Sequence, residues 1–89
     1  MKLLNSSKSK TRLEYFILKI LNEKYSNAFE IEKNLNEFKI EYERKDLYPV
    51  LSHLLLNNYL CYNWINESGN EIKYYHITPI GKIIIKKDD

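Results

Sequence analysis

Residues 46–81, DLYPVLSHLLLNNYLCYNWINESGNEIKYYHITPIG, decide the fold of this chain. They begin with an apolar stretch at helical spacing, which two asparagines interrupt. Two runs rich in aromatic and β-branched residues follow, 60–65 and 73–77, and the polar turn 66–70 between them contains the glycine that a β-hairpin favours. The order of helix, stop, strand, turn and strand predicts a helix beside a two-stranded hairpin.

A helix is predicted from about residue 44 to residue 57. Its apolar residues share one broad face at the spacing of an amphipathic helix: Leu47, Val50, Leu51, Leu54 and Leu55. Pro49 fits only near the start, because a proline deep in a helix loses a hydrogen bond and clashes with the preceding turn. Asn57 and Asn58 tolerate the left-handed backbone that ends helices, so the chain can turn into the first strand.

Two further helices are predicted before this segment. The first runs from about residue 11 to residue 24 and carries apolar residues at helical spacing: Leu13, Phe16, Ile17, Ile20 and Leu21. The second, about residues 28–36, follows Asn27, which can cap it, and Glu30 stands in the capping-box relation to that cap. The residues that the second helix should bury are Ile31 and Leu35, with Phe29 or Ala28.

Thr78 and Pro79 mark the start of a last helix, because threonine is a good cap and proline suits the first helical position. This helix is predicted over residues 79–87, with an apolar stripe formed by Ile80, Ile83 and Ile84. The chain is therefore predicted to be one α+β, mostly helical domain, residues 1–89. Three helices, a two-stranded β-hairpin wing and a C-terminal helix are the parts of a winged helix-turn-helix.

Composition narrows the class of protein. With 89 residues the chain is near the lower end of domains that fold alone, so a partner subunit would help it. The lone Cys61, predicted to be a small buried residue, and two histidines give no disulfide or zinc spacing, and neither a metal nor a cofactor is expected. No apolar run reaches the roughly 18 residues that span a bilayer, which favours a cytoplasmic protein. No phosphate loop, nucleophile elbow or paired-acid motif is present, so enzyme activity is not expected.

Positive charge is concentrated at two places although the net charge is only +2. Residues 1–12 carry four basic residues and no acid, and Arg44 and Lys45 precede the central helix. Residues 30–43 are rich in acids. Residues 1–10 are interpreted as a possible flexible basic arm, which either contacts phosphates or remains a solvated tail.

A family pattern is carried by Asp46-Leu47-Tyr48-Pro49-Val50-Leu51, Leu54, Asn58-Tyr59-Leu60, Trp64, Lys73-Tyr74-Tyr75-His76-Ile77-Thr78 and Gly81. It contains a Leu-Tyr-Pro motif, a tryptophan in the first strand, a Tyr-Tyr pair and a Thr-x-x-Gly start of the last helix. In these respects residues 11–87 resemble the PadR-type transcriptional regulators. The resemblance implies a winged helix-turn-helix, usually dimeric, that acts on DNA as a repressor or related binder.

The chain departs from that family pattern in three places. Ser52 and His53 stand where the family often has a basic residue. The wing carries Glu67 and Glu71, whereas family wings are commonly rich in arginine and lysine. Many members have a long C-terminal dimerisation helix or domain, and this chain stops at Asp89, so its dimer is expected to use other surface.

A helix that enters the major groove needs polar and basic side chains on its first turns. In helix 44–57, Arg44 and Lys45 are expected on phosphates and Tyr48 on a phosphate or a thymine methyl group. Ser52 and His53 are expected one turn later, on base edges or backbone. The other residues expected at the DNA are Tyr42, Asn70, Lys73, Lys10 and Arg12.

Plainer interpretations exist for several of these residues. The basic residues and His53 can be solvated surface groups, and Tyr48 can be a packing residue. The aromatic residues of the hairpin could form a stacking platform for single-stranded nucleic acid, but packing in the core and hairpin is favoured for them: Trp64, Tyr74 and Tyr75.

The leading interpretation is a homodimeric, sequence-specific binder of double-stranded DNA that represses transcription. Its dimer interface is expected where apolar residues exceed what one small monomer can cover, at Leu3, Leu4, Leu13, Ile80, Ile83 and Ile84. One alternative keeps the fold but makes it an architectural, viral or plasmid-partition adaptor that spreads along DNA. A second alternative, which the acidic residues 30–43 favour, is a winged helix that binds another protein and no DNA. No membrane partner is expected.

Overall fold

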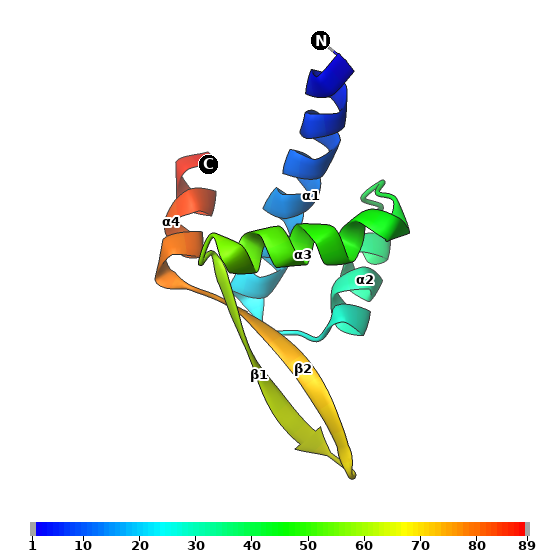
Figure 1. Ribbon diagram of the computed structural model, residues 1–89, viewed down its shortest axis with the longest axis vertical. Coiled ribbons are helices and arrows are strands. Elements are labelled where there is room, and N and C mark those ends of the chain that lie inside the picture. The colour runs from blue at the N-terminus through cyan, green and yellow to red at the C-terminus, as the bar shows by residue number, and fades with distance from the viewer. Residues whose placement is uncertain (1, 89) are drawn as a thin grey trace.

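The computed structural model describes the backbone of residues 2–88 and the side chains of residues 12–86. The elements in chain order are α1 (Lys2–Glu23), α2 (Ala28–Glu37), the 3-10 turn η1 (Arg44–Asp46), α3 (Leu47–Leu56), β1 (Leu60–Glu67), β2 (Asn70–Ile77) and α4 (Pro79–Asp88). The helices pack together and the β1–β2 hairpin projects from them (Figure 1). This arrangement confirms the predicted α+β, mostly helical winged-helix architecture. Within the described residues, no helix combines the length and apolar character needed to cross a membrane.

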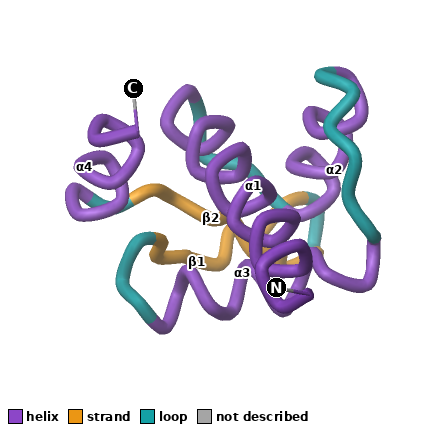
Figure 2. Tube along the Cα trace, turned by 90° about the horizontal axis from the view of Figure 1, so that it is seen from above, coloured by secondary structure: helices purple, strands orange, loops and turns teal. Residues whose placement is uncertain are grey.

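The core lies where the inner faces of the helices meet the base of the hairpin. Seen from above, α1 runs between α4 and α2 (Figure 2). α1 buries Leu18 and four of the apolar residues that were predicted from helical spacing, whereas the fifth, Phe16, is only partly buried. Tyr75 and Leu60 of the hairpin and Ile85 of α4 complete this core. The fully buried side chains, by volume, are Ile17, Leu18, Ile31, Leu35, Leu47, Leu51 and Leu54.

Hydrogen bonds at the helix ends match the predicted caps. The Asn27 side chain accepts from the Glu30 amide at 2.8 Å, and the Glu30 carboxylate accepts from the Asn27 amide at 3.1 Å. These two bonds form the capping box that begins α2. Asn58 takes the left-handed conformation at φ 63°, and the Tyr59 amide donates to the Leu54 carbonyl at 2.9 Å. α3 therefore ends as predicted, with the chain turned toward β1.

Two helix boundaries differ from the prediction. The single helix expected over residues 44–57 is the turn η1 followed by α3, which begins at Leu47 and ends at Leu56. Pro49 is thus in the first turn of α3, where the amide that it lacks would have no helical partner. α1 begins at Lys2 rather than near residue 11, so the backbone of the expected arm belongs to a helix from Lys2 onward. No glycine or proline interrupts that stretch.

The hairpin is regular along its whole length. Cross-strand pairs run from Leu60 and Ile77 at the base to Glu67 and Asn70 at the tip. The two residues of the turn have positive φ, 54° at Ser68 and 87° at Gly69, as the tight turns that match strand twist require. β2 is fastened to the helical part through Ser26 and Tyr75, which exchange two backbone hydrogen bonds of 3.1 and 2.8 Å.

Burial decides between two alternatives on α2 and shows the prediction of a buried Cys61 to be wrong. α2 turns Ile31 and Leu35 inward as predicted, and of the alternatives Phe29 and Ala28 it exposes Phe29 and partly covers Ala28. Phe29 lies about 200° around the helix from Ile31, so both cannot face the core. Cys61 is exposed as well, because its neighbour Leu60 takes the inward position and successive strand residues point to opposite faces.

Candidate nucleic-acid interface

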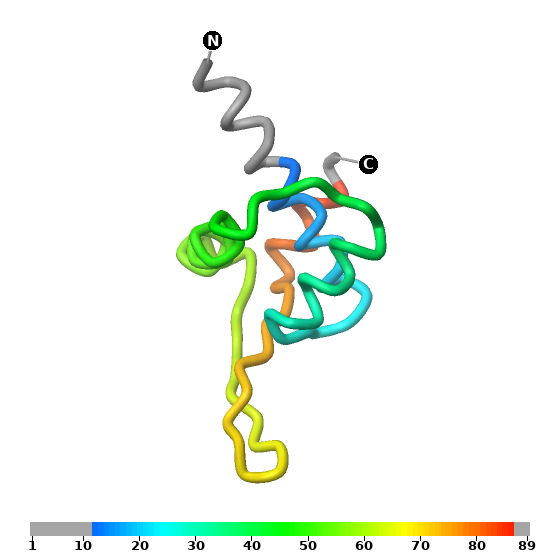
Figure 3. The backbone as a smooth tube through the Cα atoms, turned by 90° about the vertical axis from the view of Figure 1, so that its right-hand side faces the viewer, coloured from blue at the N-terminus to red at the C-terminus, as the bar shows by residue number. Residues whose placement is uncertain are grey.

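α3 and the hairpin lie along the same side of the molecule (Figure 3). α3 is held there by its inner face, where Leu47, Val50, Leu51 and Leu54 are at most 2% exposed. The outer face of α3 is therefore fixed in position relative to the hairpin. We call this outer face, together with η1, the α3 surface.

Arg44 and Lys45 stand in η1, directly before the first turn of α3, as the sequence predicted. Their side chains are 85% and 77% exposed. Each has an acidic neighbour, because Arg44 Nε lies 3.5 Å from Glu32 Oε1 and Lys45 Nζ lies 3.4 Å from Glu43 Oε1. Ion pairs this exposed contribute little to stability, so both cations can exchange these carboxylates for another anion at small cost.

Tyr42 lies beside this pair but belongs partly to the core. Its side chain is half-buried and packs against the buried cluster. Burial raises the pKa of the Tyr42 phenol, the Glu32 carboxylate raises it further, and the Arg44 guanidinium lowers it. The hydroxyl therefore stays protonated at neutral pH and can donate a hydrogen bond next to Arg44.

The middle of the α3 surface is polar and open. Tyr48 is 59% exposed, which excludes the interpretation of it as a buried packing residue, and Ser52 is exposed one turn later. Leu56 continues the same face at 83% exposure. Leu56 was not predicted to belong to this surface, although its spacing of four residues from Ser52 was the available signal.

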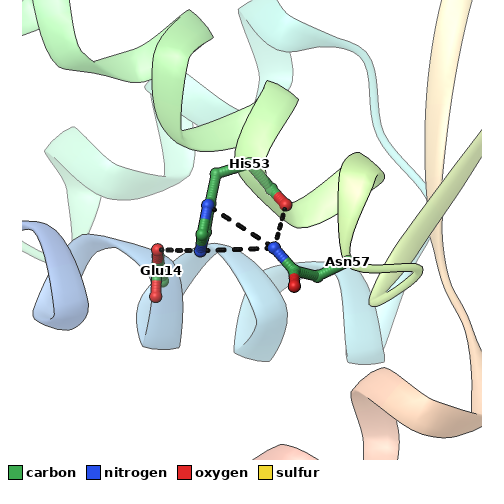
Figure 4. Close-up of polar contacts among 3 residues, drawn as sticks. All are labelled: Glu14, His53 and Asn57. Carbon is green, nitrogen blue, oxygen red and sulfur yellow. Dashed lines mark hydrogen bonds and ion pairs between the residues drawn. The ribbon is translucent and has the colours of Figure 1, made fainter.

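His53 is placed differently from the expectation. Its ring faces α1, where Nε2 lies 3.4 Å from Glu14 Oε2 (Figure 4). Asn57 donates from Nδ2 to the His53 carbonyl at 2.8 Å and lies beside the ring. The residue lies about 100° around the helix from Ser52. His53 thus contacts α1 through Glu14, although its side chain remains 57% exposed.

The two predicted wing residues occupy different parts of the hairpin. Asn70 is exposed at the tip, opposite Glu67. Lys73 is in the middle, where its ammonium lies over three rings, 4.2 Å from the centroid of Tyr62, 5.3 Å from Tyr75 and 5.9 Å from Trp64. Burial raises the pKa of the Tyr75 phenol, and the nearby phenols of Tyr48 and Tyr62 raise it further.

The hairpin aromatics divide into two groups. Tyr74 and Tyr75 are buried, as the packing interpretation predicted, and the Tyr74 hydroxyl donates to Glu67 at 2.7 Å. Trp64 packs on the hairpin rather than in the core, because its ring meets that of Tyr62 edge to face and yet stays 56% exposed. Tyr62, which was not predicted as a site residue, is 48% exposed on the same hairpin face. Two aromatic residues at strand spacing were the signal that could have identified this pair.

Arg12, one of the two basic residues predicted on α1, is not brought to the α3 surface. The Arg12 guanidinium lies 5.9 Å from the Phe16 ring centroid, and Phe16 lines an open groove of about 770 Å³ between α1 and α2. Glu14, which faces α3, lies about 200° around the helix from Arg12. The side chain of Lys10 lies outside the described residues.

The predicted dimer residues also separate. Leu13 is 2% exposed inside the monomer, so it is a core residue and not part of an accessible apolar face. Ile80 and Ile83 are exposed on α4, and Ile84 is half-buried. The side chains of Leu3 and Leu4 lie outside the described residues.

Together, a helix-turn-helix core, a fixed exposed helix with cations at its first turn and a hairpin beside it define the class of winged helix-turn-helix proteins. The sequence model of the PadR-like family of transcriptional regulators matches residues 17–87. The chain belongs to this family, which confirms the predicted resemblance. No curated protein sequence matches it significantly.

Solved structures of PadR-like proteins share the fold. The chain is similar to a PadR-like transcription factor of Bacteroides fragilis, with 29% identity and a TM-score of 0.84, over 94% of this chain and 82% of that one. It is similar to a PadR family regulator of Clostridium difficile R20291, with 26% identity and a TM-score of 0.80, over 85% and 81% of the two chains. A PadR-like regulator of Bacillus cereus gives 26% identity and a TM-score of 0.78, over 88% and 78%. The protein is thus a transcriptional regulator of the PadR-like type.

Proposed function

We propose that the protein acts inside the cell as a homodimer, binds double-stranded DNA sequence-specifically and represses transcription. The α3 surface enters the major groove, with Arg44 and Lys45 on phosphates and with Tyr48 and Ser52 toward the base edges. The observation that carries the proposal is the exposure of both cations at the first turn of a helix whose opposite face is fully buried. That arrangement presents charge and polar groups to DNA while the core sets the angle of the helix.

The proposal changes the role first expected for His53. The His53 ring lies beside Glu14 and helps to set the position of α3 against α1. Its effect on DNA binding would therefore be indirect, through the position of α3. The hairpin tip is a poor site for a phosphate, because the carboxylates of Glu67 and Glu71 are exposed there. The main phosphate contacts are therefore the cations of η1 and Lys73.

The homodimer rests on α4. Ile80 is 50% exposed and Ile83 is 55% exposed, and the two residues lie nearly on one side of the helix. A second copy that covered both would remove apolar surface from water, and a two-fold axis would use the same patch twice. Light scattering at micromolar concentration should show a dimer, and a stable monomer would contradict this part of the proposal.

DNA binding is tested by fluorescence anisotropy with a labelled duplex at two salt concentrations. Affinity should fall steeply with salt, because each neutralised phosphate releases counterions. The variant with Arg44→Ala and Lys45→Ala should bind weakly and have a salt slope smaller by about two, one per lost contact. The matched control replaces Lys24 and Lys33, two exposed lysines on the groove between α1 and α2, by alanine. Equal losses in both double variants would contradict placement of DNA on the α3 surface.

The choice between a regulator and a DNA-coating adaptor is made by footprinting on genomic DNA. A dimeric regulator protects a bounded, two-fold symmetric sequence, whereas protection that spreads with protein concentration would favour the adaptor. Wild-type protein that binds no duplex even at low salt would contradict DNA binding altogether and favour a role in protein interaction.

A further inference from the structure

One face of the hairpin exposes large aromatic rings. The residues of one face, from base to tip, form the cross-strand pairs Leu60–Ile77, Tyr62–Tyr75, Trp64–Lys73 and Asn66–Glu71. The first pair belongs to the core or packs against it, and the last is polar and exposed. The two middle pairs expose the large rings of Tyr62 and Trp64 to solvent. Packing within the hairpin alone does not require that much exposed aromatic surface.

These two middle pairs form a compact cluster, which we call the ring face: Tyr62, Trp64, Lys73 and Tyr75. The Tyr62 and Trp64 rings meet edge to face, with centroids 6.4 Å apart and planes at 86°. Lys73 holds its ammonium over three of the rings, at distances where cation–π attraction acts. The cluster therefore presents two exposed rings and one positive charge in a fixed relation.

The ring face continues the α3 surface. Tyr48 of α3 is close enough for its phenol to raise the pKa of the Tyr75 phenol, and α3 and the hairpin lie along the same side of the molecule (Figure 3). A duplex seated on α3 would extend toward Trp64 before it reached the acidic tip. The Glu71 carboxylate, to which Asn66 Nδ2 donates at 3.1 Å, would repel an anion. The surface open to a phosphate therefore ends at Glu71.

We propose that the ring face binds the DNA strand beside the α3 site, with Tyr62 and Trp64 against deoxyribose rings and exposed base edges and Lys73 on a phosphate of that strand. This inference rests on the proposed function. Its occupant is duplex DNA because deoxyribose carbons and thymine methyl groups are apolar and phosphate is anionic, which matches two rings with one ammonium. The wing of this protein then works mainly by ring contact, and the acids at its tip do not oppose it.

The chain has one tryptophan, so its indole emission reports Trp64 alone. The experiment adds an unlabelled duplex carrying the footprinted sequence and measures quenching of that emission by acrylamide. Bound DNA should protect Trp64 from acrylamide. Emission that is equally quenched in the free and bound protein would overturn the inference, and so would protection by single-stranded DNA without protection by duplex.

Variants separate ring contact from charge. Trp64→Ala should weaken duplex binding about tenfold with an unchanged salt slope, because stacking and apolar contacts release no counterions. Trp64→Phe should bind within about threefold of wild type, since a ring remains. Lys73→Gln should instead lower the salt slope by about one. The control is Phe38→Ala, which removes an exposed ring at the end of α2 and should leave binding unchanged.

The outcomes distinguish this inference from the proposed function. If the wild-type protein binds no duplex, both the proposed function and this inference are contradicted. Wild-type protein that binds duplex, loses affinity with the Arg44 and Lys45 variant, and retains full affinity with Trp64→Ala overturns the ring face alone. Loss of affinity in both Trp64→Ala and Trp64→Phe, with circular dichroism showing a disturbed hairpin, would assign Trp64 a structural role and also overturn the inference.

Discussion

α3 and α4 are both ten-residue helices with an apolar stripe, but the fold uses them in opposite ways. α3 buries four apolar side chains almost completely and exposes Tyr48, Pro49, Ser52, His53 and Leu56. α4 buries Ile85, half-covers Ile84 and leaves Ile80 and Ile83 in solvent. The apolar stripe of α3 thus faces its own core, whereas that of α4 is divided between the core and the outside.

The comparison shows that the two helices are attached to the core to different degrees. A helix that must hold polar groups at a fixed angle needs strong attachment to the core, and α3 has it. A helix that attaches to the core by few residues leaves the rest of its apolar surface exposed, and this is the surface of α4 on which the proposed dimer rests. The following predictions test this difference, from the largest expected effect to the smallest.

Leu54→Ala should cause the largest loss, lowering the free energy of unfolding by about 2–5 kcal/mol, because it leaves a cavity under α3. Ile83→Ala on α4 should change it by about 0.5 kcal/mol or less in the monomer. Urea denaturation at two protein concentrations checks both. The Leu54 loss should appear at either concentration and the Ile83 loss only where the dimer forms, so a large Ile83 loss in dilute protein would contradict the comparison.

Gly81→Ala should loosen the attachment of α4. A methyl group at this position would run into the Tyr59 carbonyl oxygen and would lie 2.8 Å from Cγ1 of Ile77. The expected cost is about 1–3 kcal/mol, as for other overpacked sites, and it exceeds the gain in helix propensity from alanine. Thermal unfolding by circular dichroism measures it, with the neighbouring exposed position as the control in Lys82→Ala. A Gly81 variant as stable as that control would show that α4 can shift without cost.

Thr78→Ala should cost about 1 kcal/mol, because the threonine hydroxyl caps α4 by accepting from the Gly81 amide at 3.0 Å. Asp46→Ala at the corresponding position of α3 should cost no more than about 0.5 kcal/mol, since Asp46 makes no side-chain cap bond there. Denaturant titration of the two variants gives both values. Equal costs would mean that caps do not distinguish the two helices.

Local signals in the sequence predicted most of the fold. The Asn27 and Glu30 pair, the Asn58 stop and the Thr78-Pro79 start each fix backbone geometry within a few residues, so neighbouring sequence is enough to identify them. Helical spacing likewise identified the buried face of α3. The family pattern then identified the arrangement of these elements.

Spacing could not predict which neighbour each side chain meets. Leu13 and Ile83 both belong to apolar stripes, yet one is covered by the core and the other is exposed, because burial depends on helices distant in sequence. His53 follows an exposed serine in sequence, but α1 places Glu14 beside it. Trp64 was expected to pack because aromatic strand residues usually do, and only the projection of the hairpin beyond the core leaves it exposed.

The Thr78 hydroxyl joins three parts of the molecule. It donates to the Asn58 carbonyl just after α3 at 2.6 Å, lies 3.1 Å from the Tyr59 carbonyl, and accepts from the Gly81 amide in α4. In a dimer built on α4, the helix at the two-fold axis and the helix in the groove would meet at this one hydroxyl, with no flexible linker between them. The two α3 helices of the dimer would then be held at a fixed separation. That separation would have to match the distance between the two half-sites of the operator, about 34 Å for successive turns of one face of the duplex. Such a protein would tolerate base changes within a half-site better than the insertion of a single base pair between the half-sites.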